Sequence, residues 1–323
     1  MKPKVWLDLK LVPEALALLT SATEVIMPGT PENLPGAAAV IIGVENKADG
    51  AFMDRAGPSL QAIARHGIGV DNVDIPAATA RGILVVNTPD GPTESTAEHT
   101  VALLLALAKR VVAGDKSLRG AGIPRPHLMG TEVRGRILGV IGVGRIGRRV
   151  AEICALGLKM RVLAYNPDFG DWNPLTAMGV EPVDHLDLLL SQADFVTLHA
   201  SLTPQTYHLL GERELRLMKP TAYLVNAGRG QLIDEAALAH VLAEGHLAGA
   251  ALDVFDPEPP LPTNPLLHMT HVVVTPHISS YTDLGYLAMG QGAVEQVLQV
   301  LRGERPKNLL NPETWPGRVE TAG

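Results

Sequence analysis

The sequence is poor in cysteine and in long apolar runs. Its 323 residues contain one cysteine, Cys154, which excludes an internal disulfide and a multi-cysteine metal site. The longest apolar stretches, such as residues 101–108, fall well short of the roughly 20 residues that cross a bilayer. Near the start of the chain, Asp8 and Lys10 interrupt the apolar run that a signal peptide needs. We therefore expect a cytoplasmic protein of a reducing compartment that does not interact with membranes.

Positive charge and aromatic side chains are also scarce. The 27 Lys and Arg residues are outnumbered by 34 Asp and Glu, and the formal net charge of -7 argues against nucleic acid as a partner. Aromatic residues make up 4% of the chain although hydrophobic residues make up 46%, so the apolar content is mainly aliphatic. Such a chain can bury a large core, which excludes a disordered protein, and its length suggests two domains.

Short β-branched runs alternate with Ala- and Leu-rich stretches of helical length along most of the chain. Several runs are apolar throughout, such as the three valines at 272–274, which is typical of parallel strands covered on both faces. The pattern predicts an α/β protein built from doubly wound parallel sheets. The expected strands are residues 4–8, 24–27, 39–42, 60–64, 83–87, 137–141, 161–165, 194–198, 222–226, 249–254 and 271–275.

Two long helical segments lie where the chain would pass between domains. The first is expected over residues 94–119, where apolar residues follow a helical period, and the second over residues 282–301. Two connections imply that one domain is discontinuous. We expect an outer domain of residues 1–97 and 286–323 and a middle domain of residues 98–285.

A glycine-rich turn follows the apolar run at 137–141. Its sequence is Gly142-Val-Gly144-Arg-Ile-Gly147, and a helix-like stretch comes after it. In a strand-turn-helix context the first glycine allows a tight turn, the second lets the backbone approach a pyrophosphate, and the third allows helix and strand to pack closely. The N–H groups at the start of the helix then attract the phosphates. The turn predicts a dinucleotide site, with Arg145 as a further candidate for the pyrophosphate.

The residue expected to contact the adenosine ribose is Asn166, at the end of the next predicted strand. A dinucleotide fold usually has an acidic residue here, which accepts hydrogen bonds from the ribose hydroxyls and repels a 2′-phosphate. Asparagine can bond the ribose but does not repel the phosphate. No arginine follows to bind that phosphate, and Asp168 would oppose it. These residues favour NAD and leave NADP open.

Three later strands are each followed by a polar side chain suited to carbonyl reduction. Arg229 can bind a carboxylate through two parallel hydrogen bonds. His277 can transfer a proton at neutral pH, and a carboxylate from Glu258 would favour its protonated form. Ligands of open α/β sheets bind beyond the carboxyl ends of the strands, so the three side chains can converge near the cofactor. Considered singly, each of the three could equally have a structural role.

No metal site is expected. His268 and His271 have a spacing that occurs in some metal sites, but no cysteine or carboxylate lies near them in the sequence.

The chain resembles the D-isomer-specific 2-hydroxyacid dehydrogenase family over nearly its whole length. The resemblance rests on residues 69–74, 97–99, 226–230, 252–259 and 275–277 and on the glycine turn. It implies a Rossmann dinucleotide-binding domain inserted into a flavodoxin-like substrate domain, and a homodimer formed through the cofactor domain. It also implies catalysis by Arg229, Glu258 and His277.

The resemblance further implies which residues contact the ligands. Ile68 and Gly69, together with Arg229, would bind the substrate carboxylate, and Asp253 would meet the nicotinamide amide. The implied cofactor-binding residues are Gly142, Gly144, Arg145, Ile146, Gly147, Asn166, His199, Ala200, Thr206, Ala227 and Asp253.

The expected activity is NAD(P)-dependent interconversion of small 2-oxo acids and D-2-hydroxy acids, with D-3-phosphoglycerate dehydrogenase as the alternative. Gly43 stands where phosphoglycerate-specific relatives often have a basic residue, although Arg65 remains as a possible phosphate contact. Formate dehydrogenase is disfavoured because it has glutamine where this chain has Glu258, and phosphonate dehydrogenase stays open. A different class also remains open, the NADH-sensing corepressors of the same fold.

Overall fold

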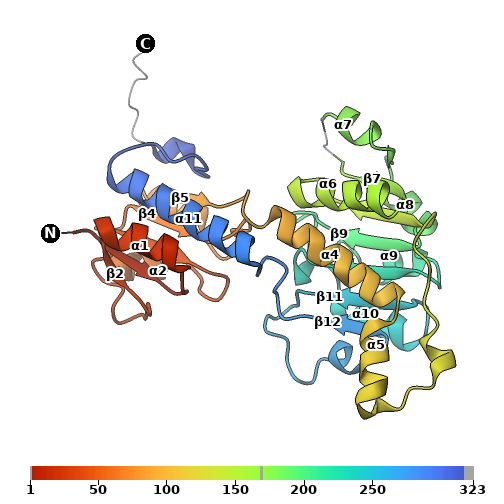
Figure 1. Cartoon of the computed structure of the whole chain (residues 1–323). Coiled ribbons are helices and arrows are strands. Elements are labelled where there is room, and N and C mark those ends of the chain that lie inside the picture. The colour runs from red at the N-terminus through yellow and green to blue at the C-terminus, as the bar shows by residue number, and fades with distance from the viewer. Residues whose placement is uncertain (1, 168–169, 316–323) are drawn as a thin grey trace. The chain divides into compact units, whose positions relative to one another are not determined.

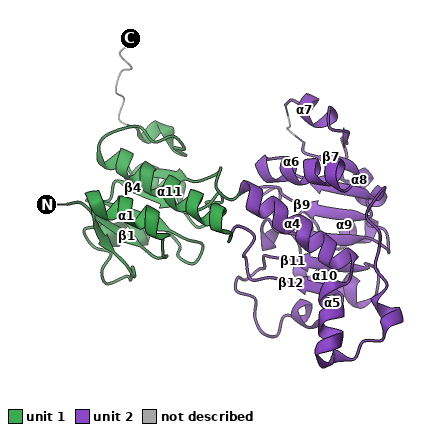
Figure 2. Cartoon of the chain, viewed as in Figure 1, with its two compact units in different colours: residues 1–92, 281–323 green, residues 93–280 purple. Residues whose placement is uncertain are grey.

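The computed structural model describes residues 2–167 and 170–315, which belong to two compact units (Figures 1 and 2). Unit 1 comprises Met1–Pro92 and Tyr281–Gly323, and unit 2 comprises Thr93–Ser280. Both junctions lie a few residues before the positions expected from the sequence. The reason is that the helix starting at Thr93 belongs entirely to unit 2, whereas the helix starting at Asp283 belongs entirely to unit 1.

Unit 1 contains a five-stranded parallel sheet in the order β2-β1-β3-β4-β5, which is the flavodoxin-like order. Its helices cover both faces of the sheet. Successive side chains of a strand point to opposite faces, so Leu7 packs in the cluster with α1 and α11 while Trp6 packs with α2 and α3. The elements are β1 (Lys4–Leu7), α1 (Pro13–Ala22), β2 (Glu24–Ile26), β3 (Ala39–Ile42), α2 (Gly50–Ala56), β4 (Ala62–Arg65), α3 (Ile75–Ala80), β5 (Leu84–Asn87) and α11 (Asp283–Leu301).

Unit 2 contains a seven-stranded parallel sheet in the order β12-β11-β10-β9-β6-β7-β8. Helices α4 and α6 cover one face, and α8, α9 and α10 cover the other. The elements are α4 (Thr93–Ala108), α5 (Val111–Lys116), β6 (Ile137–Ile141), α6 (Arg145–Glu152), β7 (Arg161–Tyr165), α7 (Asn173–Thr176), β8 (Val180–Pro182), α8 (Leu186–Gln192), β9 (Phe195–Leu198), α9 (Glu212–Leu217), β10 (Tyr223–Asn226), α10 (Glu235–Ala243), β11 (Gly249–Leu252) and β12 (Val272–Val274).

Short 3₁₀ and π turns complete the chain. They cover Ser117–Ala121, Arg125–Leu128, Ile153–Gly157, Gly230–Leu232, Pro265–His268 and Pro312–Thr314. In the part of the chain that is described, no helix is both long enough and apolar enough to span a membrane.

The predicted α/β class with two parallel sheets is confirmed, but two local predictions were wrong. The strand β8 was not predicted, because a three-residue edge strand is too short to form a pattern. One helix was predicted over residues 94–119, whereas α4 ends at Ala108 and α5 begins at Val111. The carbonyl of Ala108 accepts a hydrogen bond from the Thr131 amide, and Arg110 adopts a left-handed φ of 55°. A hydrogen bond from a residue distant in sequence therefore replaces the helical one at the end of α4. Local periodicity cannot show such a contact.

The segment that follows α11 covers the free edge of β5. The amide of Leu310 donates to the Val85 carbonyl at 2.8 Å. Asn311 is fully buried, and its side chain accepts from the Val85 amide at 2.9 Å and donates to the Ile83 carbonyl at 2.8 Å. An edge strand presents unpaired backbone groups, and Asn311 satisfies two of them.

We predict that Asn311→Ala lowers the free energy of unfolding of unit 1 by about 3 kcal/mol, because two buried backbone groups lose their partners. Urea denaturation followed by tryptophan fluorescence measures this, since Trp6 and Trp315 both belong to unit 1. Asn173→Ala, at an exposed position, is the matched control and should change the stability by less than about 0.5 kcal/mol. Equal stabilities of the two variants would contradict the role given to Asn311.

Candidate active site

The strand order of unit 2 reverses between β6 and β9. The chain proceeds outward from β6 through β7 to β8, then returns to the other side of β6 at β9. Ligands of open α/β sheets bind beyond the carboxyl ends of the strands at such a switch point. The glycine turn follows β6, and His199 follows β9, so both lie at this position.

The glycine turn has the geometry of a phosphate cradle. Gly142 has a left-handed φ of 89°, and a Cβ atom at Gly147 would overlap the Gly142 carbonyl oxygen. No described atom lies within 4 Å of the place where a Cβ of Gly144 would stand, so a ligand can approach the backbone there. The N-cap of α6 is Gly144, which has no side chain to cap the first turn of the helix. Its amide groups can therefore bind an anion, with Arg145 and Ile146 in the same turn.

Asn166 contacts the glycine turn from the end of β7. Its side-chain oxygen accepts a hydrogen bond from the Val143 amide at 3.2 Å, and the neighbouring Tyr165 carbonyl accepts from the Gly142 amide at 2.9 Å. Asp168, the residue expected to oppose a 2′-phosphate, lies outside the described residues.

His199, directly after β9, contacts the end of the strand that leads into the glycine turn. Its amide donates to the Ile141 carbonyl at 2.7 Å, and its ring Nε2 lies 3.0 Å from the Thr197 hydroxyl. Desolvation of the ring lowers the pKa of His199 to about 4, so the ring is neutral at pH 7. The backbone of Ala200 packs directly against Gly142. His199 and Ala200 therefore shape the turn through their backbone and packing.

The remaining expected cofactor residues lie on loops that follow β9 and β10. The Thr206 hydroxyl accepts from the Thr203 amide at 2.8 Å and donates to the Ser201 carbonyl at 2.7 Å, which folds the loop on itself. Ala227 is buried immediately after β10. The expected contacts of Thr206 and Ala227 with the cofactor stay predictions.

The imidazole of His277 is hydrogen-bonded to the carboxylate of Glu258. The contact joins Nδ1 of the histidine to Oε1 of the glutamate, and the two side chains are 22% and 34% exposed. A carboxylate on Nδ1 fixes the orientation of the ring. The pair thus leaves Nε2 as the nitrogen that can exchange a proton with a ligand.

Arg229 is held in the loop that follows β10. The buried side chain of Asn226 donates to the Arg229 carbonyl at 2.8 Å and accepts from the Gly228 amide at 3.0 Å. A Cβ atom at Gly230 would overlap the Phe255 backbone, so this loop packs directly against the loop that leads to Glu258. The structure therefore brings the Arg229 and Glu258 loops together at one edge of the sheet.

Glu235, at the start of α10, fixes the loop that carries Glu258. Its Oε1 accepts from the Asp256 amide at 2.6 Å, and its Oε2 accepts from Asn264 Nδ2 at 2.7 Å. Burial raises the pKa of the Glu235 carboxyl despite these hydrogen bonds. Sequence reasoning missed both Glu235 and Asn226 as functional residues. For Asn226, the only local indication of such a role was its position at the end of a predicted strand, before two small residues.

Asp253 is fully buried after β11, and the backbone that carries His277 surrounds it. Its carboxylate accepts from the amides of Ile278 and Ser279, both at 2.9 Å. The expected contact with the nicotinamide amide stays a prediction.

Ile68 and Gly69 belong to unit 1, where they follow β4. The Asn87 side chain donates to the Ile68 carbonyl at 2.8 Å, and the Gly67 amide donates to the Thr88 hydroxyl at 2.8 Å. These contacts from the end of β5 hold the turn in place. Within residues 2–167 and 170–315, no group of three or more His, Cys, Asp or Glu residues could hold a metal ion.

Comparisons with known proteins identify the family of the chain. The model of the D-isomer specific 2-hydroxyacid dehydrogenase NAD binding domain matches residues 101–279. The chain belongs to this family. It is 38% identical to glyoxylate reductase from Thermofilum pendens, with 97% of this chain and 95% of that protein covered. A solved structure from Thermus thermophilus superposes with a TM-score of 0.87 at 39% identity and covers 95% of this chain and 99% of that one.

A further relative is longer than this chain. D-3-phosphoglycerate dehydrogenase from Archaeoglobus fulgidus is 42% identical over 89% of this chain, which covers 54% of that protein. The chain thus spans about half the length of this relative. Family membership confirms the resemblance and makes unit 2 an NAD(P)-binding unit of an oxidoreductase family that acts on CH–OH groups.

We predict that alanine substitutions at two glycines of the turn have different effects on stability and on NADH binding. Gly147→Ala should lower both the unfolding free energy and the affinity for NADH, because its Cβ overlaps the Gly142 carbonyl. Gly144→Ala should leave stability within about 0.5 kcal/mol but weaken NADH binding at least about tenfold, because its methyl group occupies the pyrophosphate approach. Thermal denaturation and NADH fluorescence titration separate the two effects. Normal NADH affinity in Gly144→Ala would show that the phosphates bind elsewhere.

A second prediction concerns the acid stability of unit 2. The pKa of His199 is about 4 in the folded protein and near 6.5 in the unfolded chain, which therefore binds a proton first as the pH falls. The resulting stabilisation is present above pH 6.5 and is lost toward pH 4. In His199→Gln, the loss of unfolding free energy between pH 7 and pH 5 should be smaller by about 2 kcal/mol. Urea denaturation at both pH values measures it, with His240→Gln on the surface of α10 as control. An unchanged pH dependence would mean that His199 titrates normally.

Proposed function

We propose that this protein is an NAD(P)-dependent reductase of small 2-oxo acids that forms D-2-hydroxy acids, and that it also catalyses the reverse oxidation. The observation that carries the proposal is the His277–Glu258 hydrogen bond beside the Arg229 loop, in a unit that binds NAD(P). The pair supplies a tuned proton donor, and the arginine supplies a cation for a carboxylate. These two groups are what reduction of a 2-oxo acid requires.

Each residue has a separate task. Arg229 binds the substrate carboxylate and polarises the neighbouring carbonyl. His277, protonated and oriented by Glu258, gives its Nε2 proton to the carbonyl oxygen as that oxygen becomes a hydroxyl. In the reverse direction neutral His277 accepts the hydroxyl proton. Bound NAD(P)H supplies the hydride that reduces C2. We assign unit 1, which carries the amides of Ile68 and Gly69 after β4, as the substrate domain.

NAD is the proposed coenzyme. Asn166 Oδ1 accepts from the Val143 amide, so its side chain lies at the glycine turn where the adenosine ribose is expected. The asparagine can bond the ribose but carries no charge to exclude a 2′-phosphate. NADP is therefore the alternative that the same residue permits.

The proposed substrate class is small and unphosphorylated, such as glyoxylate or hydroxypyruvate. In unit 1 the Asp8 carboxylate accepts from the Gly43 amide at 2.7 Å, and Asn72 donates to the Gly43 carbonyl at 2.9 Å. A carboxylate is therefore bound at Gly43, the position where phosphoglycerate-specific relatives often have a basic residue, and it would repel a phosphate there. D-3-phosphoglycerate is the second candidate, supported by the 42% identity to the Archaeoglobus fulgidus protein.

We predict that the protein oxidises NADH in the presence of glyoxylate or hydroxypyruvate, with a lower kcat/KM for NADPH. The measurement is the absorbance of the reduced coenzyme across a panel of 2-oxo acids, together with 3-phosphoglycerate and NAD in the opposite direction. Turnover of 3-phosphoglycerate alone would replace the leading proposal with the second candidate. No turnover with any acid would overturn both.

His277→Ala is the matched test of the chemistry. It should lower kcat by at least about a thousandfold, a loss of roughly 4 kcal/mol of transition-state stabilisation, because the proton donor is gone. The affinity for NADH should stay within about twofold. Unchanged turnover would remove His277 from the mechanism.

A further inference from the structure

The Asp253 carboxylate accepts hydrogen bonds from more groups than the amides of Ile278 and Ser279. Its Oδ1 accepts from the Ile278 amide at 2.9 Å and from the Thr275 hydroxyl at 2.6 Å, and its Oδ2 accepts from the Ser279 amide. Its own carbonyl accepts from the His277 amide at 2.8 Å. The segment after β12 therefore bends around one buried carboxylate. His277 lies at the middle of that bend.

The conformation of His277 needs this support. Its φ of 52° is in the left-handed region, which side chains other than glycine rarely adopt and which costs roughly 1 kcal/mol. Thr275, two residues before His277, and Ile278 and Ser279, directly after it, are the residues that donate to the Asp253 carboxylate. Loss of these donors would let His277 return to an ordinary backbone conformation and leave Glu258.

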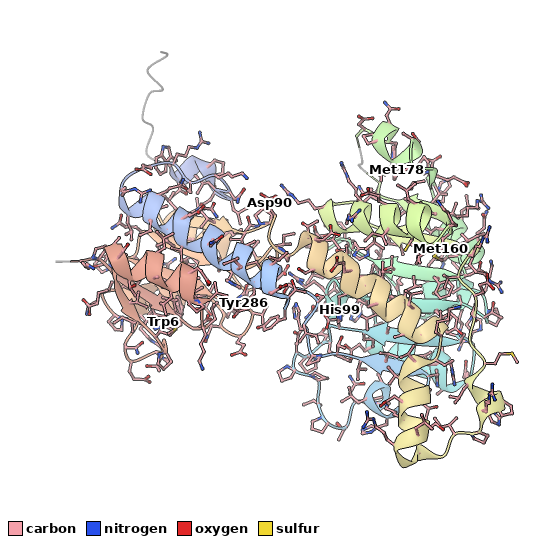
Figure 3. The ribbon with its side chains drawn as sticks, in the orientation of Figure 1. Trp6, Asp90, His99, Met160, Met178 and Tyr286 are labelled. Atoms are coloured by element: carbon pink, nitrogen blue, oxygen red, sulfur yellow. The ribbon has the colours of Figure 1, made fainter. Side chains whose placement is uncertain are left out.

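His99, which is labelled in Figure 3, lies on α4 and contacts this cluster. Its Nε2 lies 3.2 Å from the Thr275 hydroxyl oxygen and 3.6 Å from Asp253 Oδ1. The Thr275 hydroxyl has one hydrogen, which it donates to Asp253, so its oxygen must accept from His99. His99 therefore carries its proton on Nε2 and acts as a donor.

We propose that His99 is a positioning residue that holds the His277 backbone through Thr275 and the Asp253 carboxylate. His99 touches neither substrate nor cofactor in this role. The proposal rests on the proposed function for its effect on turnover, but the contact itself lies wholly within unit 2 and involves α4, β11 and the segment after β12.

The electrostatics of the cluster are consistent with this role. Burial raises the pKa of the Asp253 carboxyl, but hydrogen bonds from His99, Thr275, Ile278 and Ser279 outweigh it, and the net pKa is lowered. The carboxylate therefore stays ionised at neutral pH. A buried anion that loses a donor is costly, so the loop has reason to move when His99 is removed.

The test compares His99→Phe, which removes the donor, with His99→Gln, whose amide nitrogen can replace Nε2. His99→Phe should lower kcat about tenfold and leave KM for NADH and for the 2-oxo acid within about twofold. His99→Gln should recover at least half of the wild-type kcat. Thr275→Val should match His99→Phe, and the double variant should be no worse than Thr275→Val, because both changes break one chain of contacts. His240→Phe, an exposed histidine on α10, is the control and should keep the wild-type kcat.

The second readout does not depend on turnover. In proton–carbon spectra of the histidine rings, the His277 peak is assigned by its loss in His277→Gln. It should shift or broaden in His99→Phe and Thr275→Val and stay in place in His99→Gln and His240→Phe. If His99→Phe does not fold, the spectra still test the positioning role of His99. The His277 peak is then compared between Thr275→Val, where it should move, and His99→Gln, where it should not.

Three results would overturn the proposal. They are a His99→Phe variant that equals His240→Phe in kcat, a His99→Gln variant as impaired as His99→Phe, and a His277 peak unmoved in Thr275→Val. A wild-type protein that reduces no 2-oxo acid but shows the expected peak shifts would overturn the proposed function and leave the positioning role standing.

Discussion

The candidate active site depends on one buried carboxylate. Asp253 is fully removed from solvent, and an ionised group in that position is stable only if several donors surround it. Most of its donors come from the segment between Thr275 and Ser279, so the requirement to solvate Asp253 determines the path of that segment. His277 lies within it in a left-handed conformation. The position of the proposed acid–base group therefore follows from the hydrogen bonding of a residue that need not take part in the reaction.

The other two proposed catalytic side chains, Glu258 and Arg229, are also positioned by hydrogen bonds from residues that need not take part in the reaction. Glu258 is about one-third exposed, so its own packing does little to fix its position. Glu235 fixes its loop through the Asp256 amide, and buried Asn226 fixes the Arg229 loop through the Arg229 carbonyl. In each case a polar side chain, buried for Asn226 and partly buried for Glu235, binds the backbone of the loop that carries the reactive side chain. This division allows a reactive group to stay accessible to a ligand and yet remain well oriented.

Features that depend on neighbours in sequence were predictable, and features that depend on distant contacts were not. Apart from β8, the strands of both sheets follow from short apolar runs, and the glycine turn follows from the steric demands at Gly142 and Gly147. The three proposed catalytic residues were found through the family motifs. In contrast, the contact between His99 and Thr275 joins residues 176 positions apart, and no periodicity connects them. The break between α4 and α5 has a similar origin, since the Thr131 amide takes the last helical carbonyl.

Desolvation keeps two of the histidines neutral. The pKa of His66 in unit 1 and that of His199 in unit 2 are both lowered to about 4, chiefly because burial disfavours the charged ring. Both rings are therefore neutral at the pH where the reaction is expected to run, and neither offers a proton to a bound carbonyl. His277 differs because its Nδ1 is hydrogen-bonded to the Glu258 carboxylate. Of these three histidines, the proposed acid–base role therefore falls to the one whose ring a carboxylate orients, in the unit that also contains the Arg229 loop.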